Sequence, residues 1–141
     1  MHAAITLAKT AARLGEVPVA AVITDNAGNI IASAHNETEA GNNATHHAEL
    51  LAIARACTAL GDKILEDCTL TVTLEPCAMC AGAIAAVRLK RIVFGAYDPK
   101  SGGVEHGARV FAHSHHRPEI IGGIMESECA MLLTDFFIAK R

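Results

Sequence analysis

The sequence predicts an α/β fold with one sheet that has an antiparallel and a parallel part. In the first half of the chain, two strand-like runs flank a short turn, which is the pattern of an antiparallel hairpin. In the second half, strand-like runs alternate with helical patterns, which favours parallel pairing. The 141 residues contain no linker-like, repeated or low-complexity segment. We therefore expect residues 1–141 to form a single domain.

The first elements follow from apolar spacing. Apolar residues recur at helical intervals over Ile5–Leu14 and stop at Gly15, which predicts an N-terminal helix. The run Val17–Thr24 is typical of a strand. Residues 25–29, Asp-Asn-Ala-Gly-Asn, form a turn signal, so Ile30–Ala34 is expected to return as the second strand of a hairpin.

A helix is expected in the middle of the chain. A polar segment rich in Asn and Gly precedes the helical pattern His46–Leu60, and Gly61 is placed to end it. This assignment puts His47 and Glu49 in the first helical turn.

The remaining elements alternate in type. Thr69–Leu74 is β-branched and strand-like, residues 77–87 form the next helix, and Arg91–Phe94 is a short strand. Ile120 and Ile121 predict a last strand. Ser127 is expected to cap a final helix that runs nearly to the end of the chain.

Two short motifs indicate chemistry: His47-Ala48-Glu49, and Pro76-Cys77-Ala78-Met79-Cys80 thirty residues later. One imidazole and two thiolates can fill three positions of a zinc tetrahedron and leave the fourth to water. Zinc lowers the pKa of such a water from about 15.7 towards roughly 7. We therefore predict that His47, Cys77 and Cys80 bind one zinc ion and that Glu49 is the catalytic proton carrier.

Two other interpretations of these motifs are open. A Cys-x-x-Cys pair that follows a strand and opens a helix also occurs in redox proteins. A closed structural zinc site with His46 or Cys68 as the fourth ligand is the second alternative. Both leave Glu49 without a role, so the hydrolytic interpretation is favoured.

His-x-Glu followed by Pro-Cys-x-x-Cys is the signature of the zinc-dependent cytidine and deoxycytidylate deaminase superfamily. Within it, the chain resembles the bacterial tRNA-specific adenosine deaminases over essentially its whole length. The segments that carry this resemblance are 16–22, 48–49, 72–83 and 91–102. It implies a three-layer α/β/α cytidine-deaminase-like fold, in which helices flank a five-stranded mixed sheet and the metal lies between the starts of two helices.

The resemblance also implies a reaction and its partners. The reaction is hydrolytic deamination of adenosine to inosine at the wobble position of a tRNA anticodon, with one Zn²⁺ per chain and a zinc-activated hydroxide. The partner is the tRNA anticodon stem-loop, and family members are usually homodimers. A small-molecule deaminase acting on guanine, cytosine or a free nucleoside such as adenosine is the alternative. The segment Phe-Gly-Ala-x-Asp-Pro-Lys at 94–100 favours the RNA enzyme.

Substrate contacts are expected at five positions. Asn36 lies eleven residues before His47, which is the family's spacing for the asparagine that hydrogen-bonds the target base, and Ala48 lies inside the matched motif. Asp98 and Lys100 fall in the stretch that resembles the contact loop for flanking nucleotides. Phe136 has an aromatic neighbour on the last helix, and adjacent helical residues cannot both face one core. We expect one of the two to be a stacking platform, with Phe136 assigned to the substrate site.

Charge and composition limit the other possibilities. The net charge of −3 is unevenly distributed: residues 1–87 hold four Lys/Arg against nine Asp/Glu, whereas residues 88–141 hold eight against six. We expect the C-terminal cations to provide most of any RNA contact. No apolar run approaches the roughly 20 residues of a membrane span, and no signal peptide is recognisable, which predicts a cytoplasmic protein without membrane contact.

Two further groups of side chains are assigned no chemistry. Cys57, Cys68 and Cys129 lie in apolar segments and are expected to be buried as small apolar residues without disulfides. The second group is three histidines that are expected to lie in a solvated loop and to be neutral at pH 7: His113, His115 and His116.

Overall fold

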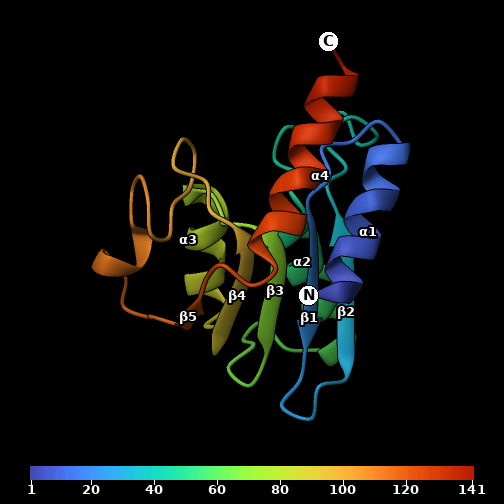
Figure 1. Ribbon diagram of the computed structural model, residues 1–141. Helices are drawn as coiled ribbons and strands as arrows, with labels where there is room; N and C mark the ends of the chain where they lie inside the picture. The colour runs from blue at the N-terminus through green and yellow to red at the C-terminus, as the bar shows by residue number, and fades with distance from the viewer.

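The computed structural model describes residues 1–141, and its elements follow the predicted order (Figure 1). The strands are β1 (Ala20–Thr24), β2 (Ile30–His35), β3 (Thr69–Leu74), β4 (Arg91–Ala96) and β5 (Glu119–Ile121). The helices are α1 (His2–Arg13), α2 (Ala48–Leu60), α3 (Ala78–Ala86), the short 3₁₀ helix η1 (Val110–His113) and α4 (Glu126–Ala139).

The five strands form one mixed sheet in the order β2-β1-β3-β4-β5. β1 pairs antiparallel with both β2 and β3, whereas β3 with β4 and β4 with β5 are parallel. Strand β1 alone therefore runs against the other four. As a result, β2 and β3 end at the same edge of the sheet, and the helices that follow them, α2 and α3, both begin there.

Helices cover both faces of the sheet, which confirms the predicted three-layer α/β/α arrangement. Helices α1 and α4 lie side by side in front of the sheet, and α2 and α3 lie behind it (Figure 1). The main core is a cluster of twenty buried residues between the sheet and the α2–α3 layer. Leu70, Ile92 and Phe94 in the sheet and Ile84 in α3 are completely buried there. None of the helices is both long enough and apolar enough to span a membrane.

Local sequence signals explain several element ends. Asp25 accepts hydrogen bonds from the backbone N–H groups of Ala27 and Asn29, and Gly28 has a positive φ, so the predicted hairpin turn is confirmed. Gly61 ends α2 in the left-handed conformation, with φ 64°, as its position predicted.

Other boundaries differ from the prediction. The first strand begins at Ala20 and not at Val17, since Pro18 has no N–H to donate to a neighbouring strand. Ser127 is not the cap of the last helix: α4 begins at Glu126, and Met125 occupies the cap position with φ 55°. The chain enters α4 over Phe94, where a Cβ on Gly122 would lie 2.5 Å from the aromatic ring. This packing fixes the helix start irrespective of the serine.

The three cysteines outside the motif are free thiols. Cys68 and Cys129 are buried as predicted, and Cys57 is half-buried. Among the histidines, His113 and His115 are exposed. His116 differs from the prediction of a solvated side chain, because it is half-buried and its Nε2 lies 2.6 Å from the carbonyl oxygen of Leu89.

Candidate active site

His47 lies immediately before α2, at its N-cap, and not inside the first turn as predicted. Its backbone is extended, with φ −72° and ψ 149°. The side-chain oxygen of Asn36, directly after β2, accepts the N–H of Ala48 at 2.9 Å. This hydrogen bond satisfies one of the free amides of the helix start. Asn36 therefore fixes the direction in which the helix, and with it the imidazole, leaves the sheet.

The two motif cysteines sit at the start of α3 in the same way. Cys77 is the N-cap, with φ −70° and ψ 173°, and Cys80 is the third helical residue. The prediction placed both within the helix. Their side chains still meet, because the N-cap and the third helical position face each other across the first turn, as in a capping box. The free N–H groups of a helix start also favour a thiolate.

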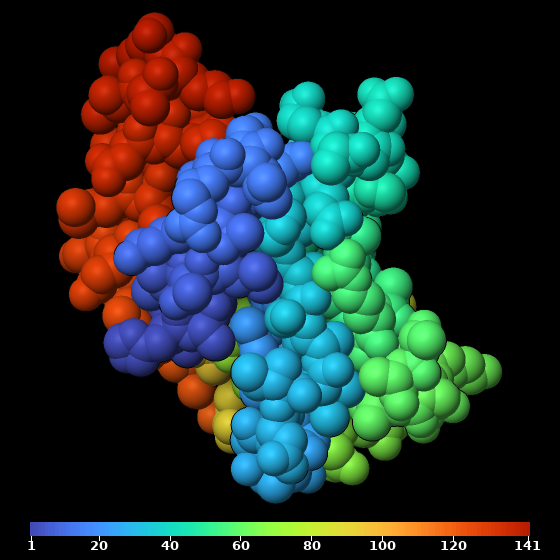
Figure 2. Space-filling model, turned by 90° about the vertical axis from the view of Figure 1, so that its right-hand side faces the viewer, coloured from blue at the N-terminus to red at the C-terminus, as the bar shows by residue number.

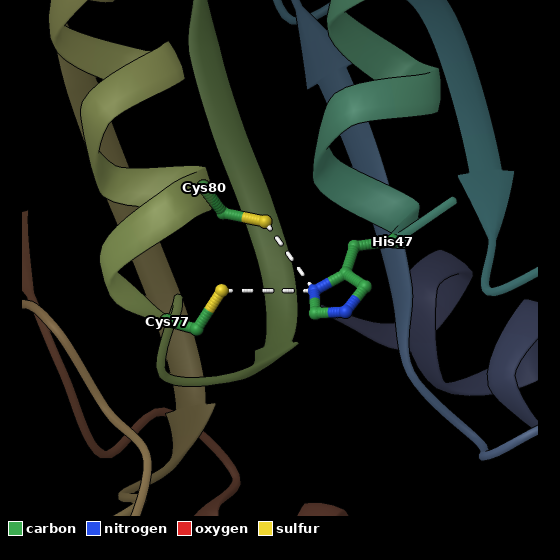
Figure 3. Close-up of side chains that lie close together, drawn as sticks. All are labelled: His47, Cys77 and Cys80. Atoms are coloured by element: carbon green, nitrogen blue, oxygen red, sulfur yellow. Dashed lines mark hydrogen bonds between the residues drawn. The ribbon is translucent and has the colours of Figure 1, made fainter. Parts of the chain in front are cut away.

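The three side chains converge from two helix starts (Figure 3). Both sulfurs lie 3.6 Å from Nδ1 of His47. The ligand atoms all lie within 4.8 Å of one another. In a tetrahedral site, Zn–N bonds of about 2.05 Å and Zn–S bonds of about 2.3 Å place N and S about 3.5 Å apart. The spacing and the donor set of the residues present therefore fit one zinc ion. Neither His46 nor Cys68 belongs to this cluster.

The three side chains influence one another's protonation. Hydrogen bonds from Cys80 and His47 lower the pKa of Cys77 to about 4. The same contact with Cys77, together with burial, raises the pKa of Cys80. The hydrogen bond with Cys77 raises the pKa of His47 against the effect of burial. One thiolate is thus already favoured by the protein, and a cation at the centre of the cluster would favour the second.

Glu49 is the second helical residue of α2, and only 3% of it is exposed. It is not one of the clustered ligand residues, although it lines the same pocket as His47 and Cys77. Burial raises its pKa, against the opposing influence of its own backbone N–H and of His47. A carboxyl group with a raised pKa can hold and release a proton near neutral pH, which suits an acid/base residue.

A pocket of about 300 Å³ opens at this edge of the sheet. Its walls come from the segment just before β1, the ends of β2 and β3, the starts of α2 and α3, and the segment after β4. The lining residues are Val17, Val19, Asn36, Thr38, His47, Glu49, Leu74, Glu75, Cys77, Asp98 and Ser101. A larger cavity of about 430 Å³ lies between α1 and α4, but no cluster of metal-binding side chains adjoins it.

The predicted substrate residues occupy different positions. Asn36 and Asp98 line the pocket. The oxygen of Asn36 is engaged by Ala48, so its amide NH₂ remains to donate to a ligand. Ala48 is completely buried and contributes only its backbone to this contact, and Lys100 is exposed outside the pocket.

The predicted stacking residue lies farther away. Phe136 is half-buried on α4, under the Nζ of Lys140, which lies 5.0 Å from the ring centre. Its neighbour Phe137 is the more exposed of the two, at 50%. The last turns of α4 and the segment 36–46 both stand out at the top of the molecule in Figure 2. Neither Phe136 nor Phe137 lines the pocket.

Sequence reasoning missed two buried carboxylates, Glu16 and Glu75, each 2% exposed. Glu16 accepts hydrogen bonds from the backbone N–H groups of Glu39 and Ala40, at 3.0 and 2.8 Å. Glu75 lines the pocket and accepts hydrogen bonds from the segment after β4. The available signal was a lone acidic residue directly beside an apolar strand, where a solvated charge is not expected.

The site and the fold define a zinc-dependent deaminase. The family model for the cytidine and deoxycytidylate deaminase zinc-binding region matches residues 1–96. The tRNA-specific adenosine deaminase of Rickettsia felis is 49% identical over 140 residues, which cover 97% of this chain and 97% of the relative. The enzyme of the same name from Bacillus subtilis is 47% identical over 143 residues, covering 100% of this chain and 88% of the relative.

A solved structure supports the same assignment. It comes from biochemical and structural studies of A-to-I editing by tRNA:A34 deaminases at the wobble position of transfer RNA. It matches with a TM-score of 0.92 and 44% identity, over 94% of this chain and 97% of that one. The chain belongs to the tRNA-specific adenosine deaminases, within the zinc-dependent cytidine and deoxycytidylate deaminase family.

Proposed function

We propose that this protein hydrolyses adenosine to inosine at the wobble position of a tRNA anticodon. The observation that carries the proposal is the convergence of His47, Cys77 and Cys80 at a pocket that Glu49 also lines. The substrate is inferred from relatives that share 45–49% identity over essentially the whole chain and are named for this activity. At about 300 Å³, the pocket is at the small end of ligand sites and suits a single extruded base.

Each residue of the site has a separate role in this proposal. His47, Cys77 and Cys80 hold the zinc ion. When bound, zinc supplies the Lewis acidity that makes hydroxide available at neutral pH. Glu49 takes one proton from the attacking water and delivers it to the ring nitrogen, and then passes the second proton of that water to the amine that leaves as ammonia. Its burial keeps bulk water from competing for these protons.

Asn36 orients the base. Its side-chain oxygen is held by the N–H of Ala48, so its NH₂ group donates to an acceptor on the purine edge. The hydrogen bond with Ala48 also links the position of the base to the start of α2, from which His47 and Glu49 project. Replacement of Asn36 is therefore expected to reduce turnover of the bound base.

The flanking nucleotides are assigned to the surface around the pocket. Asp98 lies at the pocket wall, and Lys100 is exposed two residues later, where its ammonium group can reach a phosphate. Phe136, with its neighbour Phe137, supplies an aromatic surface for an unpaired base.

We further propose a homodimer of single-domain chains, each comprising residues 1–141, in the cytoplasm. Helix α3 contains no charged side chain and exposes Met79 by 39%, which suits an apolar contact between subunits. The cytoplasm is where tRNA is found, and its reducing conditions keep the two cysteine ligands from forming a disulfide.

The proposed function is tested by offering the zinc-loaded protein an anticodon stem-loop with wobble adenosine, and separately free adenosine, cytidine, cytosine and guanine. Ammonia release should be far faster with the stem-loop, because flanking nucleotides add binding energy that positions the reacting base. A stem-loop with guanosine at the wobble position is the matched control. Efficient turnover of a free base or nucleoside, with none of the stem-loop, would establish a small-molecule deaminase instead.

A further inference from the structure

Glu75 has an unusual environment for a carboxylate that follows a strand. It directly follows β3, and its backbone N–H donates to the carbonyl of Ala96 at 2.8 Å. Its side chain is completely buried. Both carboxylate oxygens nevertheless accept hydrogen bonds, and all of the donors lie between residues 98 and 106.

One oxygen accepts the backbone N–H of Asp98 at 3.1 Å and Nδ1 of His106 at 2.8 Å. The other accepts the backbone N–H groups of Val104, Glu105 and His106, at 3.3, 3.0 and 3.1 Å. Burial by itself would raise the pKa of Glu75, but these donors outweigh burial and lower it. An ionised carboxylate is required here, since a neutral side chain offers fewer acceptor positions for the same five donors.

The segment 98–106 is held tightly against the start of α3. The N–H of Gly103 donates to the carbonyl of Pro76 at 2.8 Å, and Gly102 forms a β-bridge with Cys77. Neither glycine has room for a side chain: a Cβ on Gly102 would lie 2.4 Å from Oε2 of Glu75, and one on Gly103 would lie 2.5 Å from the backbone nitrogen of Ala78.

This segment is also a wall of the pocket. Asp98 and Ser101, near its beginning, line the pocket together with Glu75 itself. Lys100 lies between them and faces solvent. The side chain of Asp98 is turned back onto its own loop, where it accepts the N–H groups of Lys100 and Ser101 at 3.2 and 3.0 Å. The loop is thus shaped locally by Asp98 and anchored to the core by Glu75.

We propose that Glu75 is a positioning residue that holds the segment 98–106 as the wall against which the nucleotides beside the reacting base bind. The inference rests on the proposed function for the identity of the substrate. Although Glu75 borders the pocket, its side chain is completely buried and both its oxygens are engaged by this segment, so it is assigned no contact with the reacting base or the metal. It acts through the loop, so its loss should weaken substrate binding more than it slows the chemical step.

The test compares the zinc-loaded wild type with Glu75→Gln, which keeps the side chain's size but replaces one acceptor oxygen with an NH₂ group. We expect KM for the stem-loop to rise about 10- to 100-fold, the range for lost hydrogen bonds to a charged group, while kcat changes by less than about 3-fold, the pattern of lost uniform binding. Zinc content should stay the same. Hydrogen exchange should become faster at the amides of Asp98, Glu105 and His106, and remain slow in β3 and β4.

A second variant disturbs the same contact by changing the loop and leaving Glu75 in place. Gly102→Ala should displace the loop from an intact Glu75 and raise KM in the same way, which keeps the proposal testable if Glu75→Gln does not fold. Glu119→Gln, at an exposed carboxylate paired with Arg91, is the control and should leave KM unchanged.

Two results would overturn the proposal. The first is unchanged KM and unchanged loop exchange in a folded Glu75→Gln protein. The second is loss of zinc and kcat at unchanged KM, which would make Glu75 a support of the metal site. Failure of the wild type to deaminate the stem-loop would count against the proposed function, and hydrogen exchange would still decide whether Glu75 anchors the loop.

Discussion

At the scale of single residues, His47 and Cys77 both occupy N-caps, and Cys80 stands three positions after the second cap. Each cap residue has an extended backbone, so its side chain points away from the helix axis and towards the neighbouring helix. Two helix starts side by side can therefore bring one imidazole and two thiols together without distorting either helix. The free amides at both starts add a positive potential that favours the thiolates.

The first prediction concerns metal content. The wild type should hold about one zinc per chain, and Cys80→Ala should lose zinc and deaminase activity together, because two ligands cannot complete the site. Metal analysis of the purified proteins measures this. Cys57→Ala, at a half-buried thiol outside the cluster, is the control and should keep both. Full zinc occupancy in Cys80→Ala would show that the ligand assignment is wrong.

The second prediction concerns Glu49. Glu49→Ala should retain zinc but lose about 10²- to 10⁴-fold or more in rate, the usual contribution of a positioned acid/base. Single-turnover measurements with the stem-loop, alongside metal analysis, separate the two effects. A zinc-loaded Glu49→Ala protein that deaminates at near wild-type speed would contradict the proton-carrier role.

At the scale of elements, the pocket is bounded by two irregular segments that core carboxylates tie down. Glu16, just before the first strand, holds residues 38–40, and Glu75, just after the third, holds residues 98–106. Loops that carry binding residues gain precision when buried, fully hydrogen-bonded groups fix them to a rigid sheet. The two acidic residues thus connect the core to two segments that line one site.

The third prediction is that the stability contributed by Glu16, which holds residues 38–40, depends on pH. Burial raises the pKa of Glu16, but hydrogen bonds from Ala40, Glu39 and Thr38 outweigh burial and bring its pKa below the ordinary value of 4.5. A carboxyl group whose pKa is lower in the folded protein than in the unfolded chain stabilises the folded protein at pH values above the ordinary pKa. That stability is lost as pH falls through the folded-state pKa.

Urea unfolding at pH 7, 5 and 3.5 measures this effect. Glu16→Gln should be about 1–3 kcal/mol less stable than the wild type at pH 7, the usual penalty for unpaired buried donors. The difference should shrink at pH 3.5, because below the ordinary pKa of 4.5 the carboxyl group of the unfolded wild type takes up a proton and the unfolded state gains stability. Glu119→Gln is the exposed control and should follow the wild type at each pH. A constant difference between Glu16→Gln and the wild type would exclude Glu16 as the titrating group.

At the scale of the whole molecule, the strand directions decide where the site lies. Because only β1 is reversed, the end of β2, the end of β3 and the start of β1 meet at one edge of the sheet. Segments that are distant in the sequence therefore face one another across the pocket. The exposed Lys100 lies at this edge, whereas Lys63 follows α2 at the helix end away from the site.

The fourth prediction compares these two exposed lysines. Lys100→Ala should weaken stem-loop binding and reduce the slope of log affinity against log salt by about 0.7–0.9, the value of one phosphate contact. Lys63→Ala should change neither the affinity nor the slope. Filter binding at several salt concentrations gives both quantities. Equal effects of the two substitutions would mean that the loop after β4 makes no specific phosphate contact.

The sequence by itself determined the order of the elements, the chemical class of the site and the residues able to hold zinc. The reason is that these features have local signals: hydrophobic period, a left-handed glycine such as Gly61, and ligand types at fixed spacing. The tertiary structure decided what depends on contacts between distant segments. It placed His47 and Cys77 at caps, where they meet across thirty residues of sequence, and it made packing over Phe94, and not Ser127, set the start of α4. It also showed that Glu75, an acidic residue directly after a strand, accepts the hydrogen bonds that hold the segment 98–106. The sequence could not predict this role, because hydrogen bonds between distant segments produce no periodic pattern in a single sequence.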